Sequence, residues 1–575
     1  MQHATTTPLT LPSPARGEGT VDSKAAYASL NGDRTGFLGL FPLPLRERIK
    51  VRGISRRSKT VPGWSIAVTY IVLSCTAGMA EPIRSNGTGG GPWSAPATWE
   101  GGKVPTNGSV TILGKDIVDL DSSAAKSIEC DELVIDPQGM LRVTGQNKTS
   151  LRITIHKAIR VFGGMIVDFS KDPESKCEFV WETPEEGKPE LQLNDGSRVL
   201  WKGAEGDASP NVAFRMPIPK TAPKPAKARP VTLLIASRVW VECERVAMDG
   251  FDVYVNGVDG TGLKYNEACA FRNCAFNRSS AAFRLCTKIE FEGNVMQGAP
   301  AFGVTLASTS HSRIVSNVIE RTSGPSGALI VTGCSDCEII GNTVRRSVYG
   351  ISITSSSDLF LIGNRIEENR IGLQLNSCTR ITSQRCMFSR NEVMHVRAIY
   401  SRPGEPWRFY DCVFENPPTK PGAVSISVEG IVAAEIVNSP LQTYATTGKR
   451  GPLTFSAYLD VLVTNEQGEP LGRVPIRVLS GNKAIATSRT ESVGPMTGHT
   501  PLPSSHRPMV VPWHRFAPAE GSAKPTESIT YQLEVDGTTL GYAKQVVPLT
   551  MDASFVRADP DKPTKTITVK LVKGK

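Results

Sequence analysis

Short runs in which apolar and polar residues alternate recur along the middle of the chain. Two clear examples are Ile-Ser-Ile at 351–353 and Leu-Gln-Leu at 373–375. A period of two is typical of β-strands and not of helices. Each run belongs to a longer unit that recurs every 21 to 26 residues, seven times between Asn273 and Asp411. Units of this length with short strands predict a solenoid, in which each repeat buries its apolar side against the next.

Two columns of similar residues mark the repeats. The first contains Asn273, Asn294, Asn317, Asn342 and Asn364, followed by Arg385 and Asp411. We expect the asparagines to form one column, in which each side-chain amide bonds the coils above and below. The second column precedes the first by seven or eight residues and holds small side chains: Cys286, Thr309, Cys334, Ser356 and Cys378.

These two columns resemble the right-handed parallel β-helix of the pectin-lyase-like superfamily. The resemblance covers about residues 150–440 and implies an all-β, right-handed parallel β-helix solenoid. It concerns the fold and not the chemistry. The Asp pairs and Gly-His-Gly of polygalacturonases, and the clustered Asp of calcium-dependent pectate lyases, have no counterpart in these coils. No catalytic residue is therefore carried over from a family.

The flanking segments predict further domains. Residues 81–150 contain Trp93, Trp99 and several short strands, and they resemble the opening of the eight-glycine domain of cell-surface hyaluronidases. Such a unit would cap the first coil of a solenoid at 151–440. Residues 455–575 read as strand, acidic glycine turn, strand. They resemble immunoglobulin-like or carboxypeptidase-regulatory-like modules, so we expect a small β-sandwich after the solenoid.

The N-terminal region reads as a leader and a signal. Residues 61–80, after the basic pair Arg56-Arg57, have an apolar middle and a small-residue cleavage site ending at Ala80. A lipoprotein motif at Val72-Leu73-Ser74-Cys75 is the alternative. Residues 1–60 are expected to be a disordered leader from a misassigned start codon. We therefore expect a secreted, periplasmic or cell-surface protein, without a membrane span because no apolar run reaches ~20 residues.

Charge and cysteine usage narrow the partners. The net charge is +10, much of it in the first 60 residues and in 220–229, and 261–415 holds 17 Lys and Arg against 13 Asp and Glu. This excess permits an acidic polysaccharide or cell-envelope glycan as partner, and a merely solvated basic surface is the alternative. Nucleic acid is not expected, because basic and aromatic residues do not interleave. We expect a monomer without cofactor or metal, since the pair at 334 and 337 lacks a second pair.

Alternation also predicts which side chains point outward at the later coils. Gln374, Asn376, His395 and Arg397 are expected on the outer side, and the preceding turns add Arg346, Tyr349, Glu368 and Arg370.

If these residues form an active site, Arg397 or Arg370 would neutralise a substrate carboxylate and His395 or Glu368 would take a proton. Gln374, Asn376, Arg346 and Tyr349 would bind the sugar. This inventory suits β-elimination or epimerisation of a uronic acid, so an enzyme would be a polysaccharide lyase or an epimerase, with a glycoside hydrolase as a further class. The alternative is a non-enzymatic envelope or adhesion protein with the solenoid as a rigid scaffold.

Overall fold

The computed structural model describes residues 81–574 except for gaps at 122–125, 146–147, 183–188, 206–209, 218–229, 258–268, 326, 402–405, 417, 419, 421–422, 430–432, 442, 448–452, 503–507, 517–527, 561 and 563–564. The expected leader (1–60) and signal segment (61–80) lie outside the described residues. Within the described part of the chain, no helix has the length and apolarity needed to cross a membrane.

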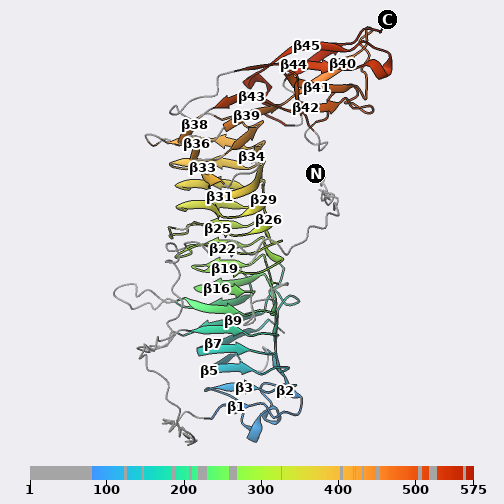
Figure 1. Cartoon of the computed structure of the whole chain (residues 1–575). Helices are drawn as coiled ribbons and strands as arrows, with labels where there is room; N and C mark the ends of the chain where they lie inside the picture. Colours follow the sequence, from blue (N-terminus) through green and yellow to red (C-terminus); the bar gives the residue numbers. More distant parts are fainter. Residues whose placement is uncertain are drawn as a thin grey trace, which may run out of the picture. The chain divides into compact units, whose positions relative to one another are not determined.

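The prediction of a parallel β-helix is confirmed: successive coils stack strand on strand (Figure 1). The first face consists of parallel strands β1 (Ile83–Arg84), β3 (Val110–Ile112), β5 (Ser127–Ile135), β7 (Ser150–Val161), β10 (Glu190–Leu193), β13 (Val231–Ile235), β16 (Phe251–Asn256), β19 (Ser280–Arg284), β22 (Val304–Ala307), β25 (Leu329–Thr332), β28 (Tyr349–Thr354), β31 (Ile371–Gln384), β33 (Met394–Ser401), β36 (Val424–Glu429) and β38 (Tyr444–Thr447).

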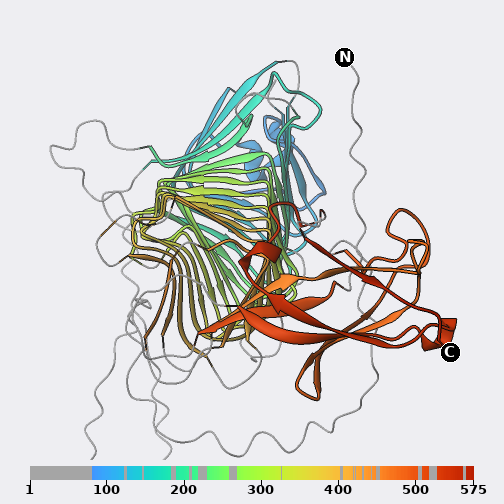
Figure 2. The ribbon, with the colours of Figure 1, turned by 90° about the horizontal axis from the view of Figure 1, so that it is seen from above.

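Two further faces complete each coil, and Figure 2 looks along the stack. The second face holds β2 (Gly90–Pro92), β4 (Ile117–Asp121), β6 (Met140–Thr144), β8 (Gly164–Asp168), β11 (Arg198–Lys202), β14 (Trp240–Glu244), β17 (Cys269–Arg272), β20 (Ile289–Glu292), β23 (Arg313–Val315), β26 (Ser335–Ile340), β29 (Ser357–Ile362), the end of β31, β34 (Trp407–Tyr410), β37 (Ala434–Val437) and β39 (Leu453–Tyr458). The third holds β9 (Lys176–Trp181), β12 (Val212–Arg215), β15 (Val246–Asp249), β18 (Ala275–Asn277), β21 (Val295–Gln297), β24 (Val318–Glu320), β27 (Thr343–Arg345), β30 (Arg365–Glu367), β32 (Met387–Ser389) and β35 (Val413–Glu415).

The parallel ladder begins earlier than the sequence suggested. Strands β1, β3 and β5 already pair in parallel with one another and with β7. Residue 150 is therefore not a boundary of the ladder, because 83–150 contribute coils of their own. The short helices η1 (Pro96–Thr98) and η2 (Glu100–Gly102) lie in this part, and the rings of Trp93 and Trp99 pack edge to face there, 5.0 Å apart.

An asparagine ladder joins neighbouring coils between the second and third faces. Asn294, Asn317, Asn342 and Asn364 are buried, and the backbone N–H of each of the first three donates to the side-chain oxygen of the next at 2.8–3.0 Å. Each amide nitrogen also donates to a backbone carbonyl inside the solenoid. The column was predicted from sequence, and these four members are confirmed.

Asn273 does not belong to this column. It is exposed with a φ of 54°, and its successor Cys274 takes the ladder position and donates its N–H to Asn294. The other coils place Gly293, Ser316, Gly341, Gly363, Arg385 and Asp411 at this left-handed bend. Asparagine tolerates the left-handed region almost as glycine does, which explains the shift of one residue.

The second column, which runs from Cys286 to Cys378, was predicted to place small side chains at one position of successive coils. The strand register aligns its five members in this way. The thiols and hydroxyls of Cys286, Thr309, Cys334, Ser356 and Cys378 each donate to the carbonyl two residues earlier. These small side chains close a left-handed bend from inside.

The C-terminal part forms two sheets. Four antiparallel strands run in the order β42 (Lys483–Arg489), β41 (Pro475–Ser480), β44 (Ile529–Val535) and β45 (Gln545–Met551). Strands β40 (Asp460–Thr464) and β46 (Thr566–Lys570) form the second sheet, and β43 (Val510–Phe516) pairs antiparallel with β39. Short helices η4 (Thr538–Leu540) and η5 (Ala553–Phe555) complete this part. The immunoglobulin-like relationship stays a prediction.

Candidate functional site

The outer side of the first face carries a register column at the later coils. Ser352 of β28, Gln374 of β31, Arg397 of β33 and Ser427 of β36 are paired one above the other. Their strand neighbours fill the core, so these four side chains point outward, as alternation predicted for Gln374 and Arg397.

Arg397 is tied to the next coil by a two-point ion pair. Its Nε and Nη2 donate to the two carboxylate oxygens of Glu429 at 2.9 and 3.1 Å. The hydrogen bond to Glu429 raises the pKa of Arg397. Glu429 was missed from sequence, although the alternation of 424–429 places it outward one coil further on. Arg397 is therefore half-buried and already neutralised by a carboxylate.

The expectation that His395 projects from the same face as Arg397 is wrong. His395 is 0% exposed, and so is Val396, which means that two successive residues face the interior. One coil earlier its register position is Gly372, where an added Cβ would lie 2.9 Å from the side-chain nitrogen of Asn391. This position is a corner that points into the solenoid, and simple alternation does not predict it.

Asn391 fixes the state of the His395 ring. The side-chain nitrogen of Asn391 lies 3.0 Å from His395 Nδ1, so Nδ1 accepts and the proton sits on Nε2. Nε2 has no hydrogen-bond partner among the described residues. Burial lowers the pKa of His395 to about 4. The imidazole is thus neutral near pH 7 and cannot reach a sugar on the outer face.

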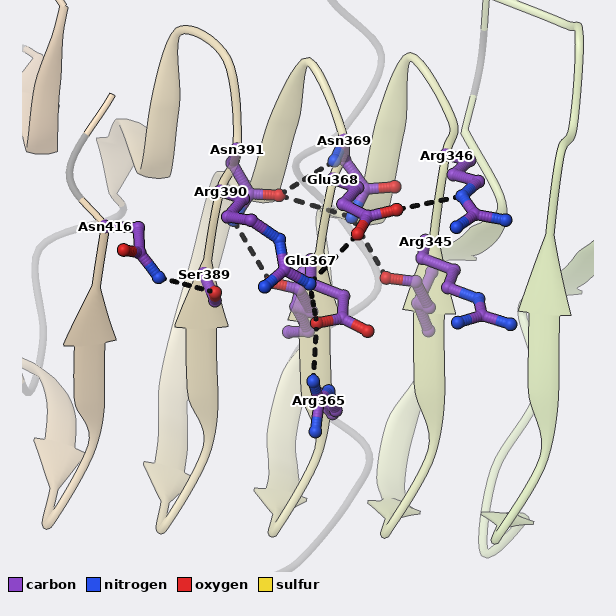
Figure 3. A network of polar contacts seen from close by, with 12 residues as sticks. Arg345, Arg346, Arg365, Glu367, Glu368, Asn369, Ser389, Arg390, Asn391 and Asn416 are labelled. Atoms are coloured by element: carbon purple, nitrogen blue, oxygen red, sulfur yellow. Dashed lines mark hydrogen bonds and ion pairs between the residues drawn. The ribbon is translucent and has the colours of Figure 1, made fainter. Parts of the chain in front are cut away.

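Arginines and glutamates form a shared network on the third-face strands β27 and β30 and at the bends that follow β27, β30 and β32 (Figure 3). Glu367, which is 3% exposed, accepts hydrogen bonds from Arg365 and Arg390, each at 2.9 Å. Glu368 accepts from Arg390 at 2.9 Å and from Arg346 at 2.8 Å. The bond from Arg346 lowers the pKa of Glu368, so this carboxylate is a poor proton acceptor.

A third glutamate forms a separate ion pair beside this network, with Glu320 one coil before Arg345 in register. Glu320 is buried and pairs with Arg345 at 2.6 Å. We call the resulting set the arginine–glutamate cluster; it contains Arg345, Arg346, Arg365, Arg390, Glu320, Glu367 and Glu368. Four guanidinium groups share three carboxylates, so the cluster keeps an excess of positive charge.

The bend positions of successive coils place these charges in a line. Register aligns Arg321, Arg346, Glu368 and Arg390, because the residues before them pair in β24, β27, β30 and β32. All four have a φ between 51° and 58°. The left-handed backbone turns their side chains away from the core, so the line of charge lies at the surface.

The remaining predicted residues surround this cluster. Arg370 is exposed in the turn before β31. Tyr349 is half-buried, pairs in register with Ile371 and adds to the electrostatic environment of Arg397. Gln374 and Asn376 are half-buried, and Asn376 accepts from the Ser377 hydroxyl at 3.1 Å. The structure thus aligns Gln374 with Arg397 on the first face and pairs Arg346 with Glu368 at the bends, while His395 points into the interior.

A second amide ladder escaped sequence analysis. Ser347 donates its N–H to Asn369, and Asn369 donates its N–H to Asn391, at 3.1 and 3.0 Å. The spacing of 22 residues is close to that of the first ladder, and it is the sequence signal that predicts these positions. This ladder ends on His395 and accounts for that residue without a catalytic role.

The cysteines lie inside the coils. Cys334 and Cys337 are buried, and each donates its thiol to a backbone carbonyl. Across the described ranges, no three His, Cys, Asp or Glu side chains gather where they could hold a metal ion.

The chain is a parallel β-helix protein with an arginine–glutamate cluster at its later coils. A family model described as periplasmic copper-binding protein (NosD) matches residues 244–416. None of the curated proteins matches the chain.

Several solved structures are similar to the chain at low scores. The periplasmic alginate epimerase AlgG is 11% identical over 61% of this chain and 78% of its own, with a TM-score of 0.24. The Azotobacter vinelandii mannuronan C-5 epimerase AlgE6 A-module is 13% identical over 60% of this chain and 89% of its own, with a TM-score of 0.25. Tailspike protein 2 of an Escherichia coli O157:H7 bacteriophage is 9% identical over 77% and 65%, with a TM-score of 0.18.

Proposed function

We propose that the protein binds an acidic polysaccharide outside the cytoplasm, along the outer side of β28, β31, β33 and β36 and the turns before them. The charge ratio of the arginine–glutamate cluster carries this proposal. Its four guanidinium groups share three carboxylates, so positive charge remains even when every carboxylate is ionised. Exposed Arg370 adds a further charge beside the cluster.

The spacing of the charges suits a polymer. Neighbouring coils lie about 4.8 Å apart, so the line of bend residues offers a charged group at four successive coils, and three of the four are arginines. A guanidinium group is a planar fork that binds a carboxylate through two hydrogen bonds. Arg346 and Arg390, at the bends that precede β28 and β33, would do this, and Gln374, Asn376 and Tyr349 would bind sugar hydroxyls.

A location outside the cytoplasm rests on two supports. The signal-like segment at 61–80 is a prediction from sequence. The family model matching 244–416 describes periplasmic proteins.

Copper binding is not proposed. Within the matched segment, the thiols of Cys274, Cys286, Cys334 and Cys378 donate to backbone carbonyls of the packed coils. The buried His395 is engaged with Asn391. The donors do not fit a copper site, because in the described part of the chain no three His, Cys, Asp or Glu side chains gather where they could hold a metal ion.

We propose that the protein binds the polysaccharide; chemical modification of the bound polysaccharide would be an additional activity. β-Elimination or epimerisation of a uronic acid needs a base beside the sugar. His395 is buried and Glu368 is held ionised by arginines, so neither supplies that base in this geometry. The alternative remains a non-enzymatic envelope or adhesion scaffold, for which the arginine–glutamate cluster would have no binding role.

Affinity electrophoresis tests the proposal. The full chain is run through gels containing polygalacturonate, alginate or neutral dextran, at low and high salt. We expect retardation by the polyuronates alone, and less retardation at 0.5 M salt, because exposed charges are screened. Arg346→Gln with Arg390→Gln should abolish the retardation. Arg142→Gln is the matched control, since Arg142 pairs one-to-one with Asp119 on an early coil.

The outcomes separate the candidates. Equal mobility in all gels overturns polysaccharide binding and favours the scaffold. Retardation accompanied by ultraviolet-absorbing unsaturated product would establish a lyase and require a base other than His395.

A further inference from the structure

The earlier coils of the first face carry a second surface feature. Leu234, Tyr254, Ala282 and Thr305 are paired in register on β13, β16, β19 and β22, and their strand neighbours fill the core. Leu234 and Tyr254 are 38% and 37% exposed. Ala282 follows with only a methyl group. The outward side chain therefore changes from the large ring of Tyr254 to the small methyl group of Ala282 one coil further on, and we call the place over Ala282 the shallow position.

Thr305, which pairs with Ala282 one coil further on, has a hydroxyl group without a hydrogen-bond partner among the described residues. Val304 and Leu306 on either side of it are in the core, so its side chain points outward. It is nevertheless only 8% exposed, and its Oγ1 has no hydrogen-bond partner among the described residues. A buried hydroxyl without a partner is costly, and a bound hydroxyl group would satisfy it.

Polar groups flank the shallow position on both sides. Asp252 lies two residues before Tyr254 on the same side of β16 and accepts a hydrogen bond from Ser280. Arg284 lies two residues after Ala282 and is exposed. No cation is paired with Asp252 among the described residues, whereas nearby Asp249 pairs with Arg278 at 2.7 Å. Burial raises the pKa of Asp252.

We propose that Tyr254, Ala282 and Thr305 form a subsite for an uncharged sugar ring, with Asp252 and Arg284 as its hydrogen-bonding flanks. The ring would lie over Ala282 against the face of Tyr254, because aromatic rings offer apolar area with a polar edge. The Thr305 hydroxyl would exchange hydrogen bonds with a sugar hydroxyl. One carboxyl and one guanidinium group on opposite sides leave the position without net charge, which favours a neutral sugar over a uronate.

This subsite rests on the proposed function and extends it, because it gives the earlier coils of the same face a role in binding the same polysaccharide. Thr305 stands four register steps before Arg397, about 19 Å away along the stack. A polysaccharide that contains both neutral and acidic sugars would meet the neutral subsite and the arginine–glutamate cluster in turn.

The test compares neutral and acidic ligands on the full chain. Isothermal titration is done with neutral oligosaccharides of glucose, mannose and galactose, and separately with oligogalacturonate. We expect at least one neutral oligosaccharide to bind. Tyr254→Ala and Ala282→Leu should weaken that binding ~10-fold or more, because they remove the ring or fill its place. Thr305→Val should weaken it ~5-fold, and Tyr254→Phe should leave it within ~2-fold.

Matched variants tell the two sites apart. Arg346→Gln with Arg390→Gln should leave neutral binding unchanged, and Tyr254→Ala should leave the affinity for oligogalacturonate within ~2-fold. Neutral binding that survives Tyr254→Ala and Ala282→Leu overturns the subsite. Oligogalacturonate binding without any neutral binding also overturns it and leaves the proposed function standing. Neutral binding without oligogalacturonate binding supports the subsite while the acidic-polysaccharide proposal fails.

Discussion

Asn391 donates a hydrogen bond to Nδ1 of His395, 3.0 Å away inside the solenoid, and His395 thereby closes the second amide ladder. In the preceding coil the side-chain nitrogen of Asn369 donates to the oxygen of Asn391 at 3.3 Å. The imidazole thus takes the role that a further asparagine oxygen would have. It does so only while Nδ1 is unprotonated, which links the stability of the later coils to pH.

His395 should make the protein less stable in acid. Its folded pKa of about 4 lies below the ordinary value of 6.5. The unfolded chain therefore binds the proton more readily, so this stability is complete above pH 6.5 and is lost as pH falls towards 4. The loss amounts to about 3 kcal/mol. Urea unfolding of the wild type and His395→Gln at pH 7 and 4.5 measures it.

The His395→Gln variant should lose most of this pH dependence. His311→Gln is the matched control, because His311 is exposed and should keep the wild-type profile. A wild-type profile in the His395 variant would contradict the assignment.

Most of the fold could be predicted from the sequence, because each coil of a solenoid needs the same residue types at the same positions. Asn294, Asn317, Asn342 and Asn364 recur at the coil period, and each fills the same buried position. A single repeat would not show this, whereas four aligned repeats do. The error at Asn273 arose where one residue type suits both a bend and a ladder.

The candidate site was harder to predict, because it depends on residues whose positions or partners differ from one coil to the next. Alternation predicts the outward column of Gln374 and Arg397 but fails at the corner that holds His395. Ion pairing depends on side-chain reach between coils, so the sharing of Arg390 by two glutamates has no signature in the spacing of the chain.

Asn342→Leu should destabilise the solenoid by about 1–3 kcal/mol. Its oxygen accepts from both nitrogens of Asn317 at 2.9 Å, and its amide donates to Ile314 and Asn364 at 2.7 and 3.0 Å. Leucine would leave these buried groups unpaired. Chemical denaturation measures the change. Asn273→Gly is the control and should alter the free energy of unfolding by less than about 0.5 kcal/mol. An equal loss in both variants would mean that the ladder register is misplaced.

Glu367→Gln should affect stability and polysaccharide binding in opposite directions. Glu367 is buried and shared by Arg365 and Arg390, which are themselves half-exposed, so the loss in stability should be about 1–2 kcal/mol. Removing its charge leaves two guanidinium groups less neutralised, and the affinity for polyuronate should rise. Thermal unfolding and affinity electrophoresis measure the two effects. A fall in affinity would show that the cluster must be fully paired to bind.

Tyr458→Phe should loosen the contact between the last coils and the C-terminal part. The Tyr458 hydroxyl donates to buried Asp411 at 3.1 Å, and Asp411 also accepts from Asn438 at 2.8 Å. Asn438 in turn accepts the backbone N–H of Arg557 at 2.6 Å, so one connected set of bonds joins these segments. Losing a hydrogen bond to a charged, buried group should cost about 1.5–3 kcal/mol.

Hydrogen exchange provides the local readout for this variant. The Arg557 amide should exchange faster in Tyr458→Phe than in the wild type, because the Asn438 side chain that holds it is less firmly oriented. Tyr531→Phe is the control: Tyr531 is also buried, but its hydroxyl has no hydrogen-bond partner among the described residues. Unchanged exchange at Arg557 together with a global loss of stability would show that Tyr458 acts through packing and not through this chain of hydrogen bonds.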